Sequence, residues 1–404
     1  MLTLRMAGII VGLLLASACQ SPAATESAAG VPKPLTPVSQ TNTPATGAAK
    51  IEESRSLVLV GLDQHWDSPS TVILMRPDGS VIAKRTLPGT WLVGAHALGA
   101  YLLVANDGSR KAWTVDASGE VREVAAAAAA ILSTPDGRSA GSPLIVDSTT
   151  AVTVQCVADG CTADQLDLRT GVVRQLLTVA RPTLLRDSPL QVLDLAADGH
   201  TVWLRKTSSS TSAGLANQAE IVGIDLRTGS ISTPGRSTSI LDGNLAITPD
   251  GTAVAGLEFV SIGQYAAGHL HVSSIDTGTD TDLQGTAELA SASSGSRSIQ
   301  FAPDGATVAW WGPLNFGPSG GTSVVNVAAR HGGGRTLLRT ANTARNEISD
   351  VFWVDPTTLL IQTDATATPG VFQGSNLQTF TIETTTGAKR SLPKDLHYLV
   401  AVLH

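Results

Sequence analysis

The sequence has few charged and few aromatic side chains for its length. Of its 404 residues, 15% are charged and 4% are aromatic, and 27 Lys and Arg against 34 Asp and Glu give a net charge of −7. A nucleic-acid-binding protein presents a basic patch or stripe, and this composition supplies none. We therefore expect no nucleic-acid partner.

Long apolar runs are also missing, apart from one near the amino terminus. Residues 7–16 are apolar and follow Arg5, but this segment is too short to span a bilayer as a mature helix. A positively charged start, a short apolar segment and small residues after it are typical of an export signal. We therefore predict that the chain is exported.

Small residues lead to Cys19 in the stretch Leu-Ala-Ser-Ala-Cys at residues 15–19. This stretch resembles the lipobox of bacterial lipoproteins, although Ala16 stands where that family usually has Leu. The resemblance implies that residues 1–18 are a lipoprotein signal peptide. It also implies that acyl chains on Cys19 anchor the protein stably to the outer face of the cytoplasmic membrane. An ordinary secretory signal with a cysteine nearby is the alternative.

The segment after Cys19 is rich in Ala, Ser, Thr and Pro and shows no apolar periodicity up to residue 50. Such a composition cannot bury enough apolar surface to fold. We predict that residues 19–54 comprise the lipidated cysteine and a flexible linker. Residues 55–404 are predicted to form the folded domain.

Cysteine is scarce, with three in the whole chain. Cys156 and Cys161 flank a stretch that is predicted to turn between two strands. We expect a disulfide between them, because exported proteins oxidise such pairs. A metal site is the rival interpretation, but no third and fourth ligand stand at a usable spacing.

A repeated pattern of an apolar run, a tight turn and a second apolar run occupies most of the remaining sequence. Its clearest copy, at residues 244–256, reads NLAITPDGTAVAG. The turn aspartates are 51, 52, 54 and 51 residues apart, at Asp147, Asp198, Asp250, Asp304 and Asp355. This period is typical of a β-propeller, because one such unit cannot bury its own apolar faces.

A second series of turns follows in the same phase. An acidic residue opens each turn and glycine closes it, at Asp167–Gly171, Asp225–Gly229, Asp276–Gly278 and Glu383–Gly387. Glycine accepts the positive φ of a hairpin turn at little cost. Each repeat is therefore predicted to be a blade of four strands.

The repeats predict an all-β, seven-bladed β-propeller. Residues 57–87 supply only three strands of the first blade, and the carboxy-terminal strand at 398–403 has no partners of its own. We predict that this strand pairs into the first blade and closes the ring without a free edge. Residues 125–143 carry an extra Pro-Asp-Gly turn out of phase, which leaves eight or six blades as alternatives. An insertion between blades is favoured there.

The unit of apolar strand, Pro-Asp-Gly turn and apolar strand resembles the repeats of TolB-like and WD-repeat-like propellers. The resemblance is clear over residues 190–310 and loose over residues 55–404. It implies a propeller fold. It implies no ligand and no reaction, since such families include partner-binding scaffolds as well as domains attached to peptidases.

Two short glycine motifs suggest an esterase. Residues 137–141 match the pattern G-x-S-x-G, and residues 331–334 read His-Gly-Gly-Gly. In esterases the glycine loop precedes the serine, which lies on a turn between a strand and a helix. In this chain the order is reversed and each motif falls where a hairpin turn is expected, so the motifs do not predict hydrolysis.

Histidines and aspartates give equally weak signals for a metal. His269 and His271 alternate along a predicted strand and share one face. Asp276, Asp280 and Asp282 lack the glycine and the terminal Glu of a calcium loop. We expect no metal and no cofactor.

Aromatic and arginine side chains gather in segments expected to form loops at one end of the propeller. These segments include residues 63–70, 205–219, 261–268, 311–321 and 364–376 and the connections between blades. Such side chains anchor interfaces when they are exposed. The candidate binding residues are Trp66, Arg186, Tyr265, Arg297, Trp311, Phe316, Arg345 and Phe372. The alternative is that tryptophans pack between blades and arginines pair with carboxylates.

These features favour a noncatalytic binding or scaffold module for a protein, glycan or small ligand, held outside the cytoplasm as a monomer. The alternative is a propeller-type lyase, lactonase or hydrolase acting on an envelope carbohydrate or a small ester. Catalysis needs converging acids and bases. The channel mouth offers few of them: His65, Asp67, Asp187 and Glu347.

Overall fold

The structure is a computed structural model. It describes residues 58–65, 68–88, 92–95, 100–105, 108–132, 143–157, 159–180, 190–210, 217–237, 245–262, 265–275, 277–288, 290–291, 299–317, 320–340, 346–365, 377–392 and 398–403. All of them belong to one compact unit, Gly47–His404. The predicted signal peptide, Cys19 and the linker lie outside the described residues.

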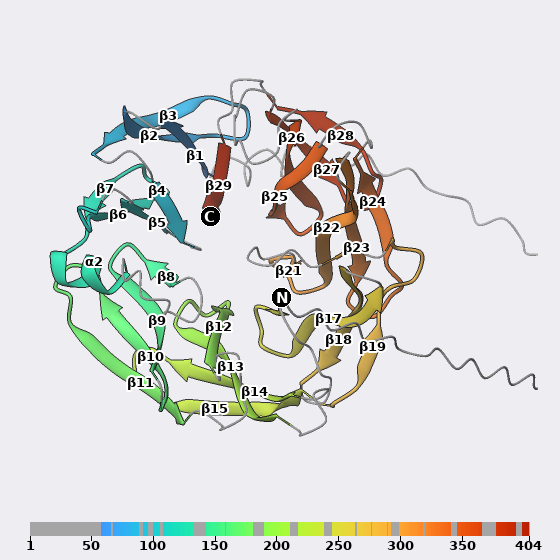
Figure 1. Cartoon of the computed structure of the whole chain (residues 1–404), viewed down its shortest axis with the longest axis horizontal. Helices are drawn as coiled ribbons and strands as arrows, with labels where there is room; N and C mark the ends of the chain where they lie inside the picture. The colour runs from blue at the N-terminus through green and yellow to red at the C-terminus, as the bar shows by residue number, and fades with distance from the viewer. Residues whose placement is uncertain are drawn as a thin grey trace, which may run out of the picture. The chain divides into compact units, whose positions relative to one another are not determined.

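Seven antiparallel sheets are arranged in a ring as the blades of a β-propeller, which confirms the predicted fold and blade number (Figure 1). Each blade has four main strands, which follow one another from the inside of the ring outwards. Blade 1 consists of β29 (Tyr398–Leu403), β1 (Val58–His65), β2 (Ser68–Met75) and β3 (Val81–Leu87). Blade 2 consists of β4 (Leu92–Ala95), β5 (Ala100–Ala105), β6 (Ala112–Asp116) and β7 (Val121–Glu123). Blade 3 consists of β8 (Leu144–Asp147), β9 (Thr150–Val157), β10 (Gly160–Asp167) and β11 (Val173–Ala180).

The other four blades follow the same order. Blade 4 consists of β12 (Leu190–Leu195), β13 (Thr201–Ser210), β14 (Asn217–Asp225) and β15 (Ile231–Ser237). Blade 5 consists of β16 (Leu245–Ile247), β17 (Ala253–Ile262), β18 (Tyr265–Ser274) and β19 (Asp280–Asp282), with β20 (Ala290–Ser291) added beside β18. Blade 6 consists of β21 (Ile299–Phe301), β22 (Thr307–Gly317), β23 (Gly320–Ala329) and β24 (Arg335–Arg339). Blade 7 consists of β25 (Asn346–Asp355), β26 (Thr358–Ala365), β27 (Leu377–Glu383) and β28 (Lys389–Ser391).

The carboxy-terminal strand closes the ring, as predicted. β29 pairs antiparallel with β1, from Val58 opposite Leu403 to Leu62 opposite Tyr398. The backbone N–H of Leu399 also donates a hydrogen bond to the side-chain oxygen of Gln362 in blade 7, at 2.9 Å. Blade 1 therefore takes its inner strand from the end of the chain, and a hydrogen bond ties that strand to the neighbouring blade.

The aspartates of the repeat shape the turns at one end of each blade. Asp198 accepts hydrogen bonds from the backbone N–H groups of His200 and Thr201, both at 2.8 Å. Gly199, which follows Asp198, takes a φ of 71°, and Gly251 takes a φ of 70°. An aspartate-capped turn closed by glycine lets the chain reverse within a few residues. We call the end of the ring that carries these turns the turn face.

Apolar side chains from facing blades form the cores between them. The fully buried Trp310 of blade 6 packs in one cluster with Leu270 of blade 5, and Trp203 of blade 4 packs with Val254 of blade 5. Burial of apolar surface contributes about 25 cal/mol per Å². Each blade therefore depends on both of its neighbours for stability.

A short helix, α2 (Ala126–Leu132), connects blades 2 and 3 and is the only helix in the described part of the chain. The repeat pattern does not predict it, but alanine is the strongest helix former and α2 is mostly alanine. This segment is a connection and not an eighth blade, which agrees with the predicted insertion. Among the described residues, no helix has the length and hydrophobicity that crossing a bilayer requires.

Leu399→Ala should destabilise the ring, because Leu399 is fully buried in the core between the closing strand and blade 7. Truncation of a buried leucine costs about 2–5 kcal/mol, so the midpoint of urea-induced unfolding should fall. Val157→Ala, at a position that is 57% exposed, is the control and should leave the midpoint unchanged. Equal midpoints for the two variants would contradict a stabilising role for ring closure.

Candidate functional site

Three of the five segments predicted as long loops between second and third strands are largely strand, whereas most of residues 364–376 lie outside the described residues. In blades 1, 5 and 6, pairing continues until two residues remain between the strands. The last pairs are His65 with Ser68, Ile262 with Tyr265 and Gly317 with Gly320. The prediction of loops over residues 63–70, 261–268 and 311–321 is therefore wrong, because ladder hydrogen bonding prevails over their glycine and proline content. We call this end of the ring, opposite the turn face, the hairpin face.

The hairpins of blades 5 and 6 extend beyond the described parts of the inner strands β16 and β21. β17 continues six residues past Gly256, the partner of Leu245, and β22 continues seven residues past Trp310, the partner of Ile299. At about 3.3 Å per residue, these two arms are about 20 Å long. β20 pairs with β18, and β23 forms a parallel pair with β25. Paired strands therefore carry the described part of the hairpin face in blades 5 and 6.

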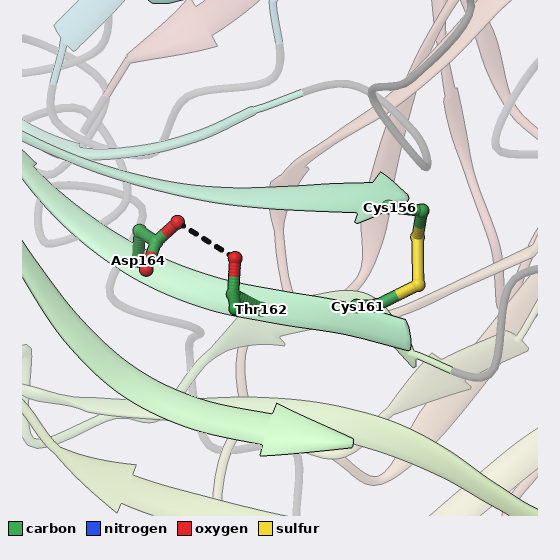
Figure 2. Close-up of a disulfide and its surroundings, with 4 residues drawn as sticks. All are labelled: Cys156, Cys161, Thr162 and Asp164. Carbon is green, nitrogen blue, oxygen red and sulfur yellow. Dashed lines mark hydrogen bonds between the residues drawn. A yellow bond between two sulfur atoms is a disulfide. The ribbon is translucent and has the colours of Figure 1, made fainter. Parts of the chain in front are cut away.

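The hairpin of blade 3 carries a disulfide near its tip (Figure 2). Cys156 lies opposite Cys161 across β9 and β10, and the two are bonded, which confirms the predicted pair. Val157, next to Cys156, is 57% exposed, whereas Cys161 is buried. The disulfide thus holds an exposed apolar residue in place at the hairpin face.

A buried polar layer lies one step below this disulfide. Thr162 Oγ1 donates a hydrogen bond to Asp164 Oδ2 at 3.0 Å (Figure 2). Asp164 is 8% exposed, and burial raises the pKa of its carboxyl group. Thr153, opposite Asp164 in β9, is buried as well. The Asp164 carboxyl group is therefore protonated more readily than an ordinary aspartate.

Three of the predicted binding residues fall in described strands. Trp311 lies in β22, is 4% exposed and packs in one cluster with Val325 and Trp353. The prediction that Trp311 belongs to an exposed loop is wrong, because its ring fills the core between blades 6 and 7. Tyr265 begins β18 and Phe316 lies one residue from the end of β22, so both belong to the tips of the arms.

The other predicted site residues cannot be placed in the fold. Trp66, Arg186, Arg297, Arg345 and Phe372 lie outside the described residues. Of the few acids and bases expected at the channel mouth, Asp67 and Asp187 also lie outside them, whereas His65 ends β1 and Glu347 lies near the start of β25.

Sequence reasoning missed a carboxylate on the inner wall of the ring. Asp350 lies in β25, the inner strand of blade 7, directly after a β-bulge and opposite Gln362. Burial raises the pKa of Asp350 to about 7. Asp194 follows a bulge in the same way in β12 of blade 4. Bulges re-aim side chains, and carboxyl groups that titrate near neutral pH are enriched at functional sites. An acid in the middle of an inner strand, followed by the apolar run Val351–Val354, is the sequence signal for Asp350.

Asp350→Asn should stabilise the protein more at about pH 8 than at about pH 5. The raised pKa means that the folded protein keeps a proton between about pH 4 and pH 7 that the unfolded chain releases. Stability therefore falls as the pH rises through this range and stays lower above it. The amide avoids this loss, which is at most about 4 kcal/mol for a shift of about three units. Urea unfolding at both pH values measures the difference.

Asp78→Asn is the control for this experiment. A side-chain hydrogen bond with Ser80 lowers the pKa of Asp78, so the amide should bring no gain at high pH. A gain for Asp350→Asn that is equal at both pH values would contradict the raised pKa.

The His-Gly-Gly-Gly motif joins blades 5 and 6. It lies in the turn between β23 and β24, where a hairpin turn is predicted. The Gly334 N–H donates to the Leu283 carbonyl at 2.5 Å, and the Gly334 carbonyl accepts from the Thr286 N–H at 2.8 Å. A Cβ atom on Gly334 would collide with the Leu283 carbonyl oxygen and the Trp310 ring. This backbone approach explains the glycine. The G-x-S-x-G match at residues 137–141 lies outside the described residues.

Gly334→Ala should destabilise the protein strongly, whereas Gly332→Ala should not. The nearest atom to a Cβ atom on Gly332 is the Ala329 Cβ at 3.4 Å, an ordinary contact. We expect a loss of about 1–3 kcal/mol or more for Gly334→Ala from overpacking, measured as the shift in the urea midpoint. Equal midpoints for the two alanine variants would show that the motif is not a packing contact.

His271 belongs to a small polar group on the outer half of blade 5. Ser273 Oγ donates to Asp280 Oδ1 at 3.0 Å, and His271 Nδ1 lies 3.6 Å from Asp280 Oδ2. β18 carries His271 and Ser273, and β19 begins with Asp280, so these contacts stabilise one hairpin. Within the described ranges, no three His, Cys, Asp or Glu side chains gather as metal ligands do.

Comparison with known proteins identifies no family for the chain. No family model matches the chain, and no curated protein matches it. Three solved structures illustrate what it is similar to. An oligogalacturonate lyase in complex with manganese is 13% identical, with 82% of this chain and 83% of that chain covered and a TM-score of 0.44. TolB from Acinetobacter baumannii is 14% identical, with 90% and 88% covered and a TM-score of 0.39. A putative 6-phosphogluconolactonase from Bacteroides fragilis is 12% identical, with 86% and 96% covered and a TM-score of 0.47.

Proposed function

We propose that this protein is a lipid-anchored, extracytoplasmic β-propeller whose hairpin face binds a partner protein, an envelope glycan or a small ligand without catalysing a reaction. The observation that carries the proposal is the disulfide-locked hairpin of blade 3, which exposes Val157 beside Cys156. An exposed apolar residue on a cross-linked hairpin is suited to contact with another molecule. The protein acts as a monomer in this proposal.

The rigidity of the hairpin face supports binding. A surface that must become ordered on contact loses conformational entropy, and a preorganised surface avoids this loss. The disulfide and the ladder pairing of the arms hold the backbone of this face before a ligand arrives. Tyr265 and Phe316, near the tips of the arms, are proposed as anchors beside Val157. The remaining proposed contacts are Trp66, Arg186, Arg297, Arg345 and Phe372.

The disulfide also supports the proposed location. Disulfides persist in oxidising compartments and are rare in the cytosol. The bond between Cys156 and Cys161 therefore agrees with the export signal and with the lipobox-like sequence at Cys19. We place the protein at the outer face of the cytoplasmic membrane, with acyl chains on Cys19 as its anchor.

Crosslinking and co-purification from native membranes test the binding role. Val157→Glu puts a charge on the hairpin face and should lose a partner that the intact protein captures. Ala388→Glu is the matched control, because Ala388 is exposed beside the start of β28, at the turn face of blade 7, and should not contact that partner. Both variants should unfold at the midpoint of the intact protein. A partner retained by Val157→Glu, or lost equally from both variants, argues against binding at the hairpin face.

A propeller enzyme that acts on an envelope carbohydrate or a small ester is the second candidate. The observation that favours it is Asp350, whose pKa of about 7 suits general acid or base catalysis at neutral pH. Hydrolysis of p-nitrophenyl acetate and of a simple lactone, followed from about pH 5 to pH 9, is the test. An activity that titrates near pH 7 and disappears in Asp350→Asn would support the enzyme over the binding module.

A further inference from the structure

Exposed apolar side chains gather at one place on the propeller. Of the six large apolar residues that the described part of the chain leaves exposed, five stand at the start of an outermost strand. Val81 and Ile82 begin β3 of blade 1, Val172 and Val173 begin or directly precede β11 of blade 3, and Ile231 begins β15 of blade 4. In blade 2 the half-buried Val121 begins β7. We call these six residues the apolar arc.

Contacts between neighbouring blades lie beside the arc residues. Between blades 1 and 2, the space beside Gly119 is filled by the side chains of Ala83 and Ile82. Between blades 2 and 3, the uncharged helix α2 lies against the turn of blade 3, with Ala127 beside Gly171. Between blades 3 and 4, Arg174 Nη2 donates to the Leu226 carbonyl at 2.6 Å. The arc therefore runs along four adjacent blades.

The corresponding positions of the other three blades are charged. The outermost strands of blades 5, 6 and 7 begin with Asp280, Arg335 and Lys389, all of them exposed. Strand propensity favours Val and Ile at any of these seven positions, so propensity alone does not explain why only four adjacent blades have them. The division of the ring into an apolar and a charged part points to a contact made by one side of the turn face.

The arc lies at the end of the ring where the described chain begins. Val81 pairs with Met75 and Leu59 pairs with Met75 in turn, which places the start of β3 beside Val58. The proposed lipid anchor, Cys19, precedes Val58 by 39 residues. A flexible linker of this length has a mean span of about 35 Å. The anchored membrane is therefore within reach of the turn face of blade 1 and its neighbours.

Charged residues around the arc suit a membrane surface. Lys84, Arg85, Arg169 and Arg227 are exposed within a few residues of it. The carboxylates of Asp78, Glu123 and Asp167 are exposed nearby as well, and Glu120 pairs with Arg122. The basic side chains can contact anionic headgroups where they stand beside the apolar ones, as on surfaces that rest in the lipid headgroup region.

We propose that the apolar arc is the surface with which the propeller rests on the lipid bilayer that holds its anchor. This inference rests on the proposed lipid anchor at Cys19. Contact at the turn face directs the hairpin face away from the membrane, toward its ligand. The occupant of the arc is lipid and not a second protein.

Photocrosslinking of the lipidated full-length protein in vesicles of phosphatidylethanolamine and phosphatidylglycerol tests the proposal. Val173→p-benzoylphenylalanine and Ile231→p-benzoylphenylalanine should form phospholipid adducts, detected as a mass shift. The matched controls are the same replacement of Arg335 and Lys389, which begin the outer strands of charged blades. We expect at least a fivefold excess of adduct at the two arc positions.

The possible outcomes of this experiment distinguish a failure of the apolar-arc proposal from a failure of the lipid-anchor proposal. If the protein binds the membrane but forms no lipid adducts, or forms equal amounts at all four positions, the apolar arc does not contact lipid. The proposed lipid anchor is unaffected by that result. Protein adducts in place of lipid adducts at residues 173 and 231, in native membranes, overturn the choice of lipid as the occupant. A Cys19 peptide without acyl chains overturns the anchor, and the arc proposal falls with it. Unfolding midpoints equal to that of the intact protein exclude misfolding, since both arc positions are exposed.

Discussion

A four-stranded blade has two apolar faces, and neither can be buried within the blade. Side chains such as Trp310, Trp203 and Trp311 are buried because a neighbouring blade covers them, so each blade stabilises the next around the ring. A row of blades would still leave two faces open at its ends. Packing of blade 7 against blade 1, as of Leu360 against Leu59 and Leu399, covers both open faces, and the pairing of β29 with β1 completes blade 1. Ring closure is therefore the constraint on which the other contacts depend.

The turn face carries the same kind of tight turn in blade after blade, because the chain must reverse there within a few residues. In several repeats a carboxylate fixes the backbone N–H groups of a tight turn and a glycine takes the positive φ, as at Asp198 and Gly199. Reversal within so few residues leaves little freedom to vary the sequence. The hairpin face has no such requirement, since its strands can lengthen without disturbing the cores. Arms of different length and a disulfide appear there, and a site that differs between blades can form there.

The sequence was sufficient for the fold and insufficient for the candidate site, for physical reasons that particular residues illustrate. Turn aspartates and glycines act locally, so their spacing predicted seven blades and the closing strand. The disulfide follows from two cysteines flanking a turn. Trp311 was misplaced because glycine and proline after it suggest a loop, whereas the ladder of β22 and β23 continues past them. Asp350 was missed because its pKa depends on burial in the folded chain, which no local pattern encodes.

The position of ring closure decides at which face of the ring β1, the first described strand, begins, and so from which face the proposed linker would lead away. The chain enters the ring at the second strand of blade 1, and that strand starts at the turn face. A chain that began one strand earlier or later would emerge at the hairpin face, because successive strands are antiparallel. An anchored linker would then hold the arms and the Cys156 hairpin against the membrane. Closure by the carboxy-terminal strand thus stabilises the ring, and with the proposed lipid anchor it would also leave the hairpin face free for the proposed binding role.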